Sequence, residues 1–173
     1  MNEIYAEPNV LVVDGYNVIN RLPDLKPASV NLLENSRLQL ALRVSAWGRL
    51  HPETECLIIF DGDRKVAHGG GQNLAGVRCV FSDQAHGGDE EIIRRVREFR
   101  LKKRLVTVVS DDNQVANNCR AHGAIIEPAR FLAIPKASLS NRPAKPGTGG
   151  KGIDARTAAR INKEMAEVFG RKE

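Results

Sequence analysis

The amino-acid sequence predicts an α/β fold in which a doubly wound parallel sheet is flanked by helices. Short runs rich in valine and isoleucine, apolar without alternation, are typical of strands that are buried on both faces of a parallel sheet. Segments with the 3.6-residue period of amphipathic helices lie between these runs, as a doubly wound sheet requires. The chain has 173 residues, of which 42% are hydrophobic, so it is long enough for one domain with its own core and an appendage.

The expected strands and helices alternate along the chain. The apolar runs cover residues 10–13, 56–60, 77–81 and 105–109, with a weaker run at 124–126. The segments with helical period cover residues 31–50, 89–103 and 112–122. Gly123 follows the third of these helices directly, at a position where glycine is a favoured C-cap.

Two stretches interrupt the alternation. Residues 64–76 contain four glycines and no helical period, so we expect a flexible loop or an irregular crossover there. Residues 133–152 contain three prolines, four glycines, four basic residues and no acid, which is typical of a mobile linker. A last helix is predicted at residues 153–169. We therefore expect a domain at 1–132, a basic linker at 133–152 and a C-terminal helical extension at 153–173.

The positive charge of the chain is concentrated at its C-terminal end. Residues 1–129 hold 16 basic and 17 acidic side chains, net −1, whereas residues 130–173 hold 10 basic and 4 acidic side chains, net +6. A nearly neutral body with a basic extension favours a polyanionic partner such as nucleic acid, with Lys151 among the candidate phosphate contacts. Solubility alone is the alternative explanation of a net charge of +5.

Cysteine usage and the N-terminal residues indicate the compartment. The three cysteines form no CxxC pair and leave one over in any disulfide scheme, which favours a reducing cytoplasm. Glu3 and Glu7 occupy the stretch where a secretory leader would be basic and then apolar, and the sequence contains no long apolar run. We therefore expect a cytoplasmic protein without a leader or a membrane span.

Acidic side chains follow the predicted strands. Asp14 and Asp61 come directly after apolar runs, Asp111 comes one residue after another, and Asp89 opens a helix behind two glycines. The carboxyl ends of parallel strands share one crevice, where two carboxylates about 4 Å apart would repel by roughly 4 kcal/mol. A hard divalent cation, Mg²⁺ or Mn²⁺, would neutralise such a cluster and suits the opening of phosphate esters.

Simpler roles exist for single members of this set. Asp89, Asp111 and Asp112 each stand at a strand-to-helix junction, where aspartate is a favoured N-cap. Asp61 belongs to an Asp-Gly-Asp sequence that is common in turns, and Asp83, after a fourth strand, has the setting of a solvated loop residue. Acids after four consecutive apolar runs favour the metal site over these separate roles.

Further polar residues near these acids are candidate contacts to a substrate. Asn17 is a candidate uncharged ligand or phosphate donor, or else a turn residue, and Ser110 is a candidate to orient Asp111 or to cap the following helix. Arg94 and Arg95 begin a basic run that continues to residue 104. This run is either an RNA track or the solvated face of an amphipathic helix.

Five segments together resemble a known family. LVVDGYNVI, LIIFDG, VRCVFS followed by GGDEEIIRR, VVSDDNQVA and HGAIIEPARFL occur in this order between about residues 10 and 132. The ordered set resembles the NYN-domain ribonucleases of the PIN-like superfamily, specifically the bacterial YacP-like group. The glycine-rich residues 69–71, the linker and the terminal helix depart from the family pattern.

The resemblance implies a PIN-like (Rossmann-like) parallel sheet flanked by helices, and a metal-dependent RNA endonuclease. Its acids correspond to Asp14, Asp61, Asp89 and Asp111, with Asn17 beside the first. Some members act on mRNA at the ribosome, which makes the ribosome a candidate partner besides RNA itself.

We therefore expect a cytoplasmic ribonuclease that uses Mg²⁺ or Mn²⁺, with four aspartates holding the metal that activates water for attack at phosphorus. Two alternatives remain at this level. One is a non-catalytic RNA-binding or ribosome-associated module on the same fold. The other is an aspartyl phosphotransferase with Asp61 as the nucleophile, which would require a nearby lysine that the sequence does not obviously supply.

Overall fold

The computed structural model describes residues 8–62, 71–82 and 87–134, and its residues up to Ala133 belong to one compact unit. The linker from residue 135 on and the last predicted helix lie outside the described residues, as do Asp83 and Lys151. None of the described helices is both long enough and apolar enough to cross a membrane.

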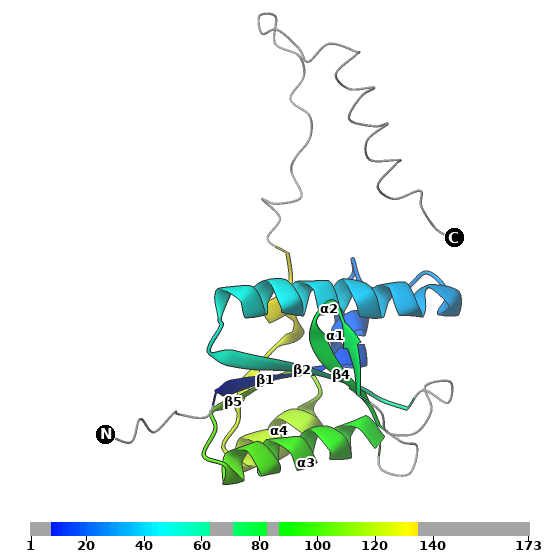
Figure 1. Cartoon of the computed structure of the whole chain (residues 1–173). Helices are drawn as coiled ribbons and strands as arrows, with labels where there is room; N and C mark the ends of the chain where they lie inside the picture. Colours follow the sequence, from blue (N-terminus) through cyan, green and yellow to red (C-terminus); the bar gives the residue numbers. More distant parts are fainter. Residues whose placement is uncertain (1–7, 63–70, 83–86, 135–173) are drawn as a thin grey trace, which may run out of the picture. The chain divides into compact units, whose positions relative to one another are not determined.

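A six-stranded sheet forms the centre of this unit (Figure 1). Its strands, in chain order, are β1 (Asn9–Asp14), β2 (Thr54–Phe60), β3 (Gly71–Leu74), β4 (Val77–Phe81), β5 (Val106–Val109) and β6 (Ile125–Glu127). They lie in the order β3-β4-β2-β1-β5-β6, with β3 antiparallel to β4 and every other neighbouring pair parallel. The predicted α/β fold with a parallel sheet is confirmed.

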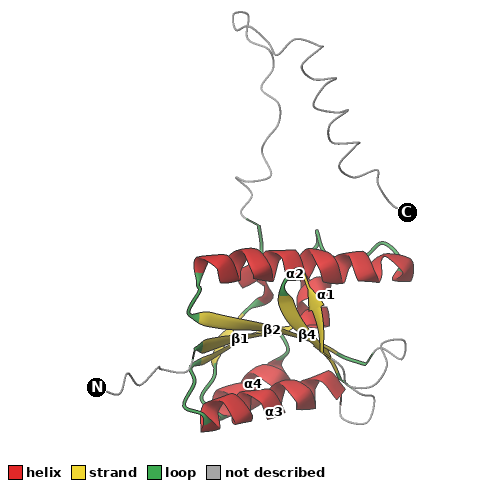
Figure 2. Ribbon diagram, in the orientation of Figure 1, coloured by secondary structure: helices red, strands yellow, loops and turns green. Residues whose placement is uncertain are grey.

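Helices cover both faces of the sheet (Figure 2). The helices are α1 (Gly15–Arg21), α2 (Leu33–Leu50), α3 (Gly87–Leu101) and α4 (Asn113–Ala121), with short 3-10 turns at Val30–Leu32 and Ala129–Leu132. Helices α1 and α2 lie on one face, and α3 and α4 lie on the other. The three helices predicted within this unit are therefore confirmed, while α1 was not predicted.

The central strands are apolar at every position because both of their faces are buried. Leu11 and Val13 of β1 belong to the core cluster beneath α1 and α2, whereas Val10 and Val12 belong to the cluster beneath α3 and α4. All four side chains are at most 1% exposed. Successive strand residues point to opposite faces, so a two-sided core requires an unbroken apolar run.

The flexible loop or irregular crossover expected at residues 64–76 is wrong from residue 71 on, and residues 64–70 lie outside the described residues. Residues Gly71–Leu74 form β3, which pairs with β4 at the edge of the sheet. Ala75 and Gly76 connect the two strands with positive φ angles of 50° and 81°, as a two-residue hairpin turn requires. The sequence Gly-Gln-Asn-Leu carries no apolar pattern because this strand is exposed and is held mainly by backbone pairing.

The first helix begins directly at Gly15, without a loop after β1. A Cβ atom at Gly15 would lie 2.4 Å from two ring carbons of Phe60, so only glycine lets the chain turn this tightly over the sheet. This turn places Asn17 on α1, close to the carboxyl end of β1.

Arg104 connects residues at the other end of the sheet, where β1 and β2 begin. Its guanidinium donates to Glu55 Oε2 on β2 at 2.7 Å and to the Pro8 carbonyl at 2.6 Å, and it lies 4.9 Å from the centre of the Phe99 ring. The side chain is 6% exposed, so these contacts replace most of its hydration.

We expect Arg104→Met to lower the free energy of unfolding by about 2 kcal/mol, because the carbonyl and the carboxylate lose their charged donor. The melting temperature would fall by roughly 5 °C. Arg97→Met on the exposed face of α3 is the matched control, since the described residues give Arg97 no ion pair. Equal melting temperatures for the two variants would contradict this role of Arg104.

Candidate functional site

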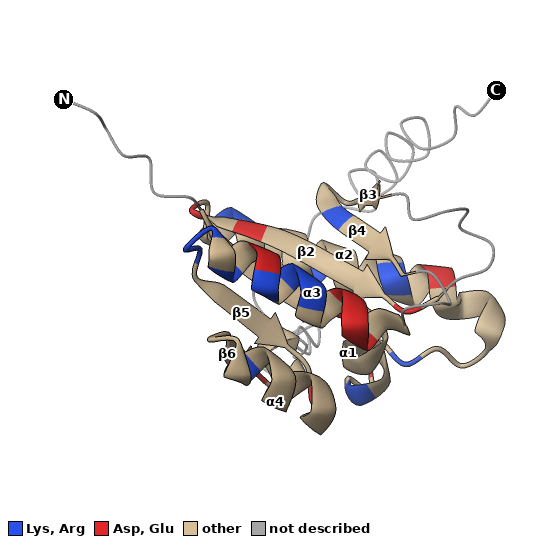
Figure 3. Cartoon of the chain, turned by 90° about the horizontal axis from the view of Figure 1, so that it is seen from below, with Lys and Arg blue, Asp and Glu red and all other residues tan. Residues whose placement is uncertain are grey.

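Four aspartates lie at the carboxyl ends of the parallel strands, and a fifth lies at the beginning of α3. Asp14 ends β1, Asp61 follows β2, Asp111 and Asp112 lie between β5 and α4, and Asp89 lies in the first turn of α3. The strands β2, β1 and β5 are neighbours in the sheet, so their ends meet at one edge. Figure 3 shows the acidic first turn of α3 on the side toward which the strand arrows point. We call these five residues the acidic edge.

Asp14 is a half-buried carboxylate of the acidic edge, at the end of β1. Burial raises its pKa from 3.8 to about 6, and the charges of Asp89 and Asp112 raise the pKa further. Two hydrogen bonds oppose this effect, one from the Ser110 hydroxyl to Asp14 Oδ2 at 2.8 Å and one from the backbone N–H of Asn17. Without a cation, the carboxyl of Asp14 therefore takes up a proton at a pH of about 6, much closer to neutrality than an ordinary aspartate does.

Ser110 orients Asp14 rather than Asp111. Its side chain is almost completely buried, and its Oγ both donates to Asp14 and accepts the backbone N–H of Asp112 at 3.1 Å. The hydroxyl thus connects the end of β1 to the end of β5. The sequence had suggested that Ser110 orients Asp111 or caps the following helix, and neither suggestion included this connection.

Asp61 is fixed against the beginning of α3. Its Oδ1 accepts the backbone N–H of Gly88 at 2.9 Å and the hydroxyl of Ser82 at 3.1 Å. A Cβ atom at Gly88 would lie 2.9 Å from Asp61 Cβ and 3.2 Å from its Cα, so glycine permits this approach. Ser82 was not predicted as a site residue, although its place directly after β4 is the signal that marked the aspartates.

Asp89 is exposed, yet its pKa is raised by partial burial and by the charges of Asp112 and Asp61. Carboxylates from three different segments therefore act on one another. Among the described residues, no ion pair involves a carboxylate of the acidic edge. The edge thus carries negative charge that the described protein groups do not neutralise.

Asp111 and Asp112 have different surroundings. Asp112 Oδ1 accepts the N–H groups of Gln114 and Val115 at 2.8 and 3.0 Å, which makes it the N-cap of α4. Asp111 Oδ2 accepts the N–H of Ala129 at 3.2 Å, and its Oδ1 accepts no hydrogen bond from the part of the chain that the structure describes. The capping role that the sequence left open among these residues belongs to Asp112.

Asn17 connects α1 to the end of β5. Its Oδ1 accepts the backbone N–H of Asp111 at 2.9 Å. The amide oxygen is therefore occupied by the protein, and the amide NH₂ is the group of Asn17 that could donate to a phosphate oxygen.

The two arginines expected to contact substrate form ion pairs along α3. Arg94 pairs with Glu91 at 2.7 Å and also with Glu98, and Arg95 pairs with Glu91 at 2.8 Å. Ion pairs of this kind are typical of the solvated face of an amphipathic helix, which was one of the two roles that the sequence left open for this basic run. The Arg94 side chain is nevertheless 52% exposed, and exposed pairs of this kind are weak enough to exchange partners.

The donor atoms of the acidic edge suit a hard divalent cation. They are all carboxylate oxygens, and the pKa values of Asp14 and Asp89 are raised mainly by burial and further by neighbouring carboxylates. Within the described ranges, however, no three His, Cys, Asp or Glu side chains already converge as a group that could hold an ion. The chemistry of the donors fits a metal, and binding would require the side chains to draw together.

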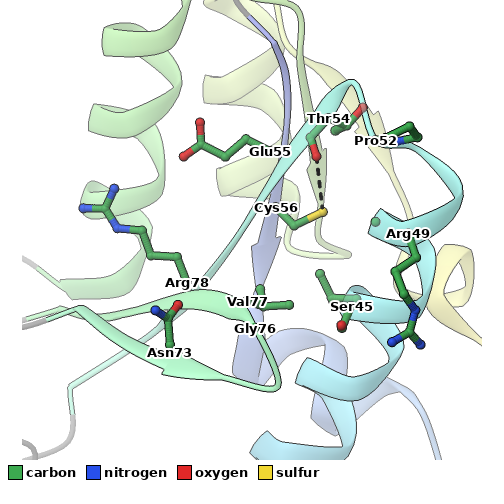
Figure 4. A pocket seen from close by; sticks show the side chains of 12 residues that line it. Ser45, Arg49, Pro52, Thr54, Glu55, Cys56, Asn73, Gly76, Val77 and Arg78 are labelled. Atoms are coloured by element: carbon green, nitrogen blue, oxygen red, sulfur yellow. Dashed lines mark hydrogen bonds between the residues drawn. The ribbon is translucent and has the colours of Figure 1, made fainter.

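A pocket of about 380 Å³ lies at the other end of the sheet, between α2, the beginning of β2 and the β3–β4 turn (Figure 4). Thr54, Cys56 and Val77 are among its lining residues, and Thr54 and Asp61 lie at opposite ends of β2. Burial raises the pKa of the Cys56 thiol to about 11, so it stays protonated and unreactive. This pocket is separate from the acidic edge.

Comparisons with known proteins agree with this fold. The family described as YacP-like NYN domain matches residues 11–168. The crystal structure of Rae1 (YacP) from Bacillus subtilis is similar, with a TM-score of 0.60, 20% identity, and coverage of 94% of this chain and 82% of that chain. A tryptophan-to-leucine mutant of Rae1 gives a TM-score of 0.61, 20% identity, and coverage of 94% and 85%. No match was found among the curated proteins.

Proposed function

Because the chain belongs to the YacP-like NYN domain family, which is a family of nucleases, we propose that it is a metal-dependent RNA endonuclease that hydrolyses phosphodiester bonds at the acidic edge. The observation that carries this proposal is the half-buried carboxyl of Asp14, whose pKa is raised to about 6 mainly by burial and further by the charges of Asp89 and Asp112. A carboxyl that is withdrawn from water beside other acids, with no ion pair among the described residues, is costly for a structural role and suits a cation-dependent one.

In this proposal Asp14, Asp61, Asp89 and Asp111 hold Mg²⁺ or Mn²⁺. The ion, when bound, supplies activation of water and shielding of the leaving oxygen. Ser110 keeps the carboxylate of Asp14 in place, and the Gly88 N–H together with Ser82 keeps that of Asp61 in place. These hydrogen bonds fix two ligands from separate strands before any ion arrives.

We assign RNA contacts to groups around the edge. The Asn17 amide lies next to Asp111, and Arg94 and Arg95 lie on α3, five and six residues beyond Asp89. Lys151 and the other basic residues of the extension add phosphate contacts, and the ribosome is a candidate site of action. Cytoplasmic location belongs to the same proposal.

A cleavage assay with and without chelator tests the proposed activity. One single-stranded and one hairpin RNA are incubated with the full chain in Mg²⁺, in excess EDTA, and in EDTA followed by excess Mg²⁺. We expect internal cleavage in the first and third samples alone. Binding without cleavage in every sample would favour a non-catalytic RNA-binding module instead.

Removing the extension tests its expected contribution to RNA binding. Truncation after Pro135 removes nine basic and four acidic residues and leaves the acidic edge unchanged. We expect metal-dependent cleavage to persist, RNA affinity to fall, and the slope of log affinity against log salt to become shallower by roughly 2 to 3 for three or four lost contacts. An unchanged affinity with an unchanged slope would show that the extension does not contact RNA.

A further inference from the structure

The outer face of α2 carries apolar side chains that the described residues leave uncovered. Leu38 and Leu42 are 41% and 47% exposed, and Ala46 is exposed as well. Residues four apart lie on the same side of a helix, so these three form one ridge. Leu32, just before the helix, and Leu50, at its end, are 47% and 79% exposed. We call these five residues the α2 ridge.

Among the described residues, the ridge lies on the outer side of α2. Helix α2 buries Leu40, Ala41 and Val44 against the sheet, so its opposite side faces away from the core. Figures 1 and 2 show α2 at the top of the view, on the face of the sheet opposite to α3 and α4. Apolar side chains in a row on an outer helix face, here with the exposed Asn35 and Gln39 beside them, are available for contact with another protein.

Two opposite charges stand near the two ends of α2. Glu34 and Arg49 are both exposed, and the described structure gives neither of them an ion pair. At 100° per residue, Glu34 and Arg49 lie on the same side of a line drawn along the helix through Leu42, and Leu50 lies on the other side. The acidic Glu34 therefore lies beside the beginning of the ridge, and the basic Arg49 lies beside its end, on the same side of the helix. Leu32 and Leu50 are the two ends of the ridge itself.

We propose that the α2 ridge is the self-complementary surface through which two copies of this chain associate, with their α2 helices antiparallel. In a two-fold arrangement centred on Leu42, Leu38 of one copy packs on Ala46 of the other. Glu34 of one copy then faces Arg49 of the other, and Leu32 of one copy lies near Leu50 of the other. Each contact occurs twice, as symmetry requires.

The pairing of a large with a small residue supports this arrangement. Leu38 projects where the partner's ridge has only the methyl group of Ala46, which permits the interaxial distance of 8 to 10 Å typical of packed helices. One helix pair of 18 residues buries less surface than a standard interface of about 1,600 Å², so we expect reversible association in the micromolar range. Helices α3 and α4 would stay uncovered in both copies, since they lie on the opposite face of the sheet.

Sedimentation velocity of the full chain from about 1 to about 500 μM tests the proposal. The wild type is expected to shift from monomer to dimer across this range. Leu42→Glu, which places two carboxylates face to face on the symmetry axis, is expected to remain monomeric. Leu101→Glu is the matched control, because Leu101 is 84% exposed at the end of α3, far from the ridge, and it should dimerise like the wild type.

A charge-reversal cycle identifies the partner as a second copy. Glu34→Arg alone and Arg49→Glu alone should each weaken dimerisation by roughly tenfold, and the double variant should restore it. Circular dichroism confirms that each exposed substitution leaves the fold intact. A wild type that is monomeric at every concentration overturns the proposal, and so does a double variant that stays as weak as the single ones. Neither result depends on RNA cleavage.

Discussion

Asp14→Asn is expected to reduce RNA cleavage severely and, at the same time, to make the metal-free protein more stable. The variant loses a charged ligand, which should reduce cleavage by roughly a hundredfold to a thousandfold or more. Asparagine keeps an oxygen that accepts the hydrogen bond from Ser110, so the end of β1 stays braced. A residue that served only the fold would not show these two effects together.

The stability gain has a defined pH dependence. The folded-state pKa of Asp14, about 6, lies above the reference value of 3.8, so ionisation of this carboxyl disfavours the folded state. The penalty is absent below pH 3.8, grows between pH 3.8 and 6, and is complete above pH 6, where it reaches at most about 3 kcal/mol. Asparagine removes it, so the advantage of the variant should be largest at pH 7.5 and should vanish toward pH 4.

Urea denaturation in EDTA at several pH values measures this difference. Asp24→Asn is the matched control, because Asp24 is paired with Arg43, which lowers the pKa of its carboxyl. That variant should be no more stable than the wild type at pH 7.5, and it should cleave RNA normally. If Asp14→Asn unfolds at a lower urea concentration than the wild type at pH 7.5, Asp14 is a structural residue and the proposed ligand role is wrong.

A second large effect on RNA cleavage is expected for Asp111→Asn but not for Asp112→Asn, although the two aspartates are adjacent in the sequence. Asp111→Asn should reduce cleavage at least about a hundredfold, because it removes the carboxylate that we assign to the metal. Asp112→Asn should retain cleavage within about tenfold. Asparagine is as good an N-cap as aspartate, so its side-chain oxygen can accept the same hydrogen bonds from the N–H groups of Gln114 and Val115, and α4 stays capped.

Single-turnover cleavage rates at saturating Mg²⁺ make this comparison, with melting temperatures of both variants as the control for folding. The reverse order of effects would move the ligand role from Asp111 to Asp112. This is a sharp test because Asp112, unlike Asp111, raises the pKa values of both Asp14 and Asp89.

Much of the fold could be predicted because buried parallel strands have a distinctive composition. The run at residues 10–13 is apolar throughout, and the structure explains this by the core clusters on both sides of β1. In contrast, β3 could not be predicted, because Gly71–Leu74 is an exposed edge strand whose pairing involves backbone atoms. Helix α1 was missed because seven residues carry too little periodicity to be distinguished from a turn.

The candidate site was predictable in its position and less so in its details. The rule that parallel strands end at one edge placed the aspartates together. It could not tell which of Asp111 and Asp112 caps α4, because two adjacent acids satisfy the same sequence signal. It also could not assign Ser110 to Asp14, since that hydrogen bond joins residues 96 positions apart in the chain.

The ends of the RNA products test the central claim most directly. The full chain and Asp14→Asn are each incubated with a defined RNA in Mg²⁺, and the new termini are identified by mass spectrometry. Hydrolysis by water at a metal-loaded acidic edge predicts 5′-phosphate and 3′-hydroxyl termini with the wild type and severely reduced cleavage with Asp14→Asn. A 2′,3′-cyclic phosphate, or the same products in excess EDTA, would contradict the account, because the ribose hydroxyl would then be the nucleophile or the metal would be unnecessary.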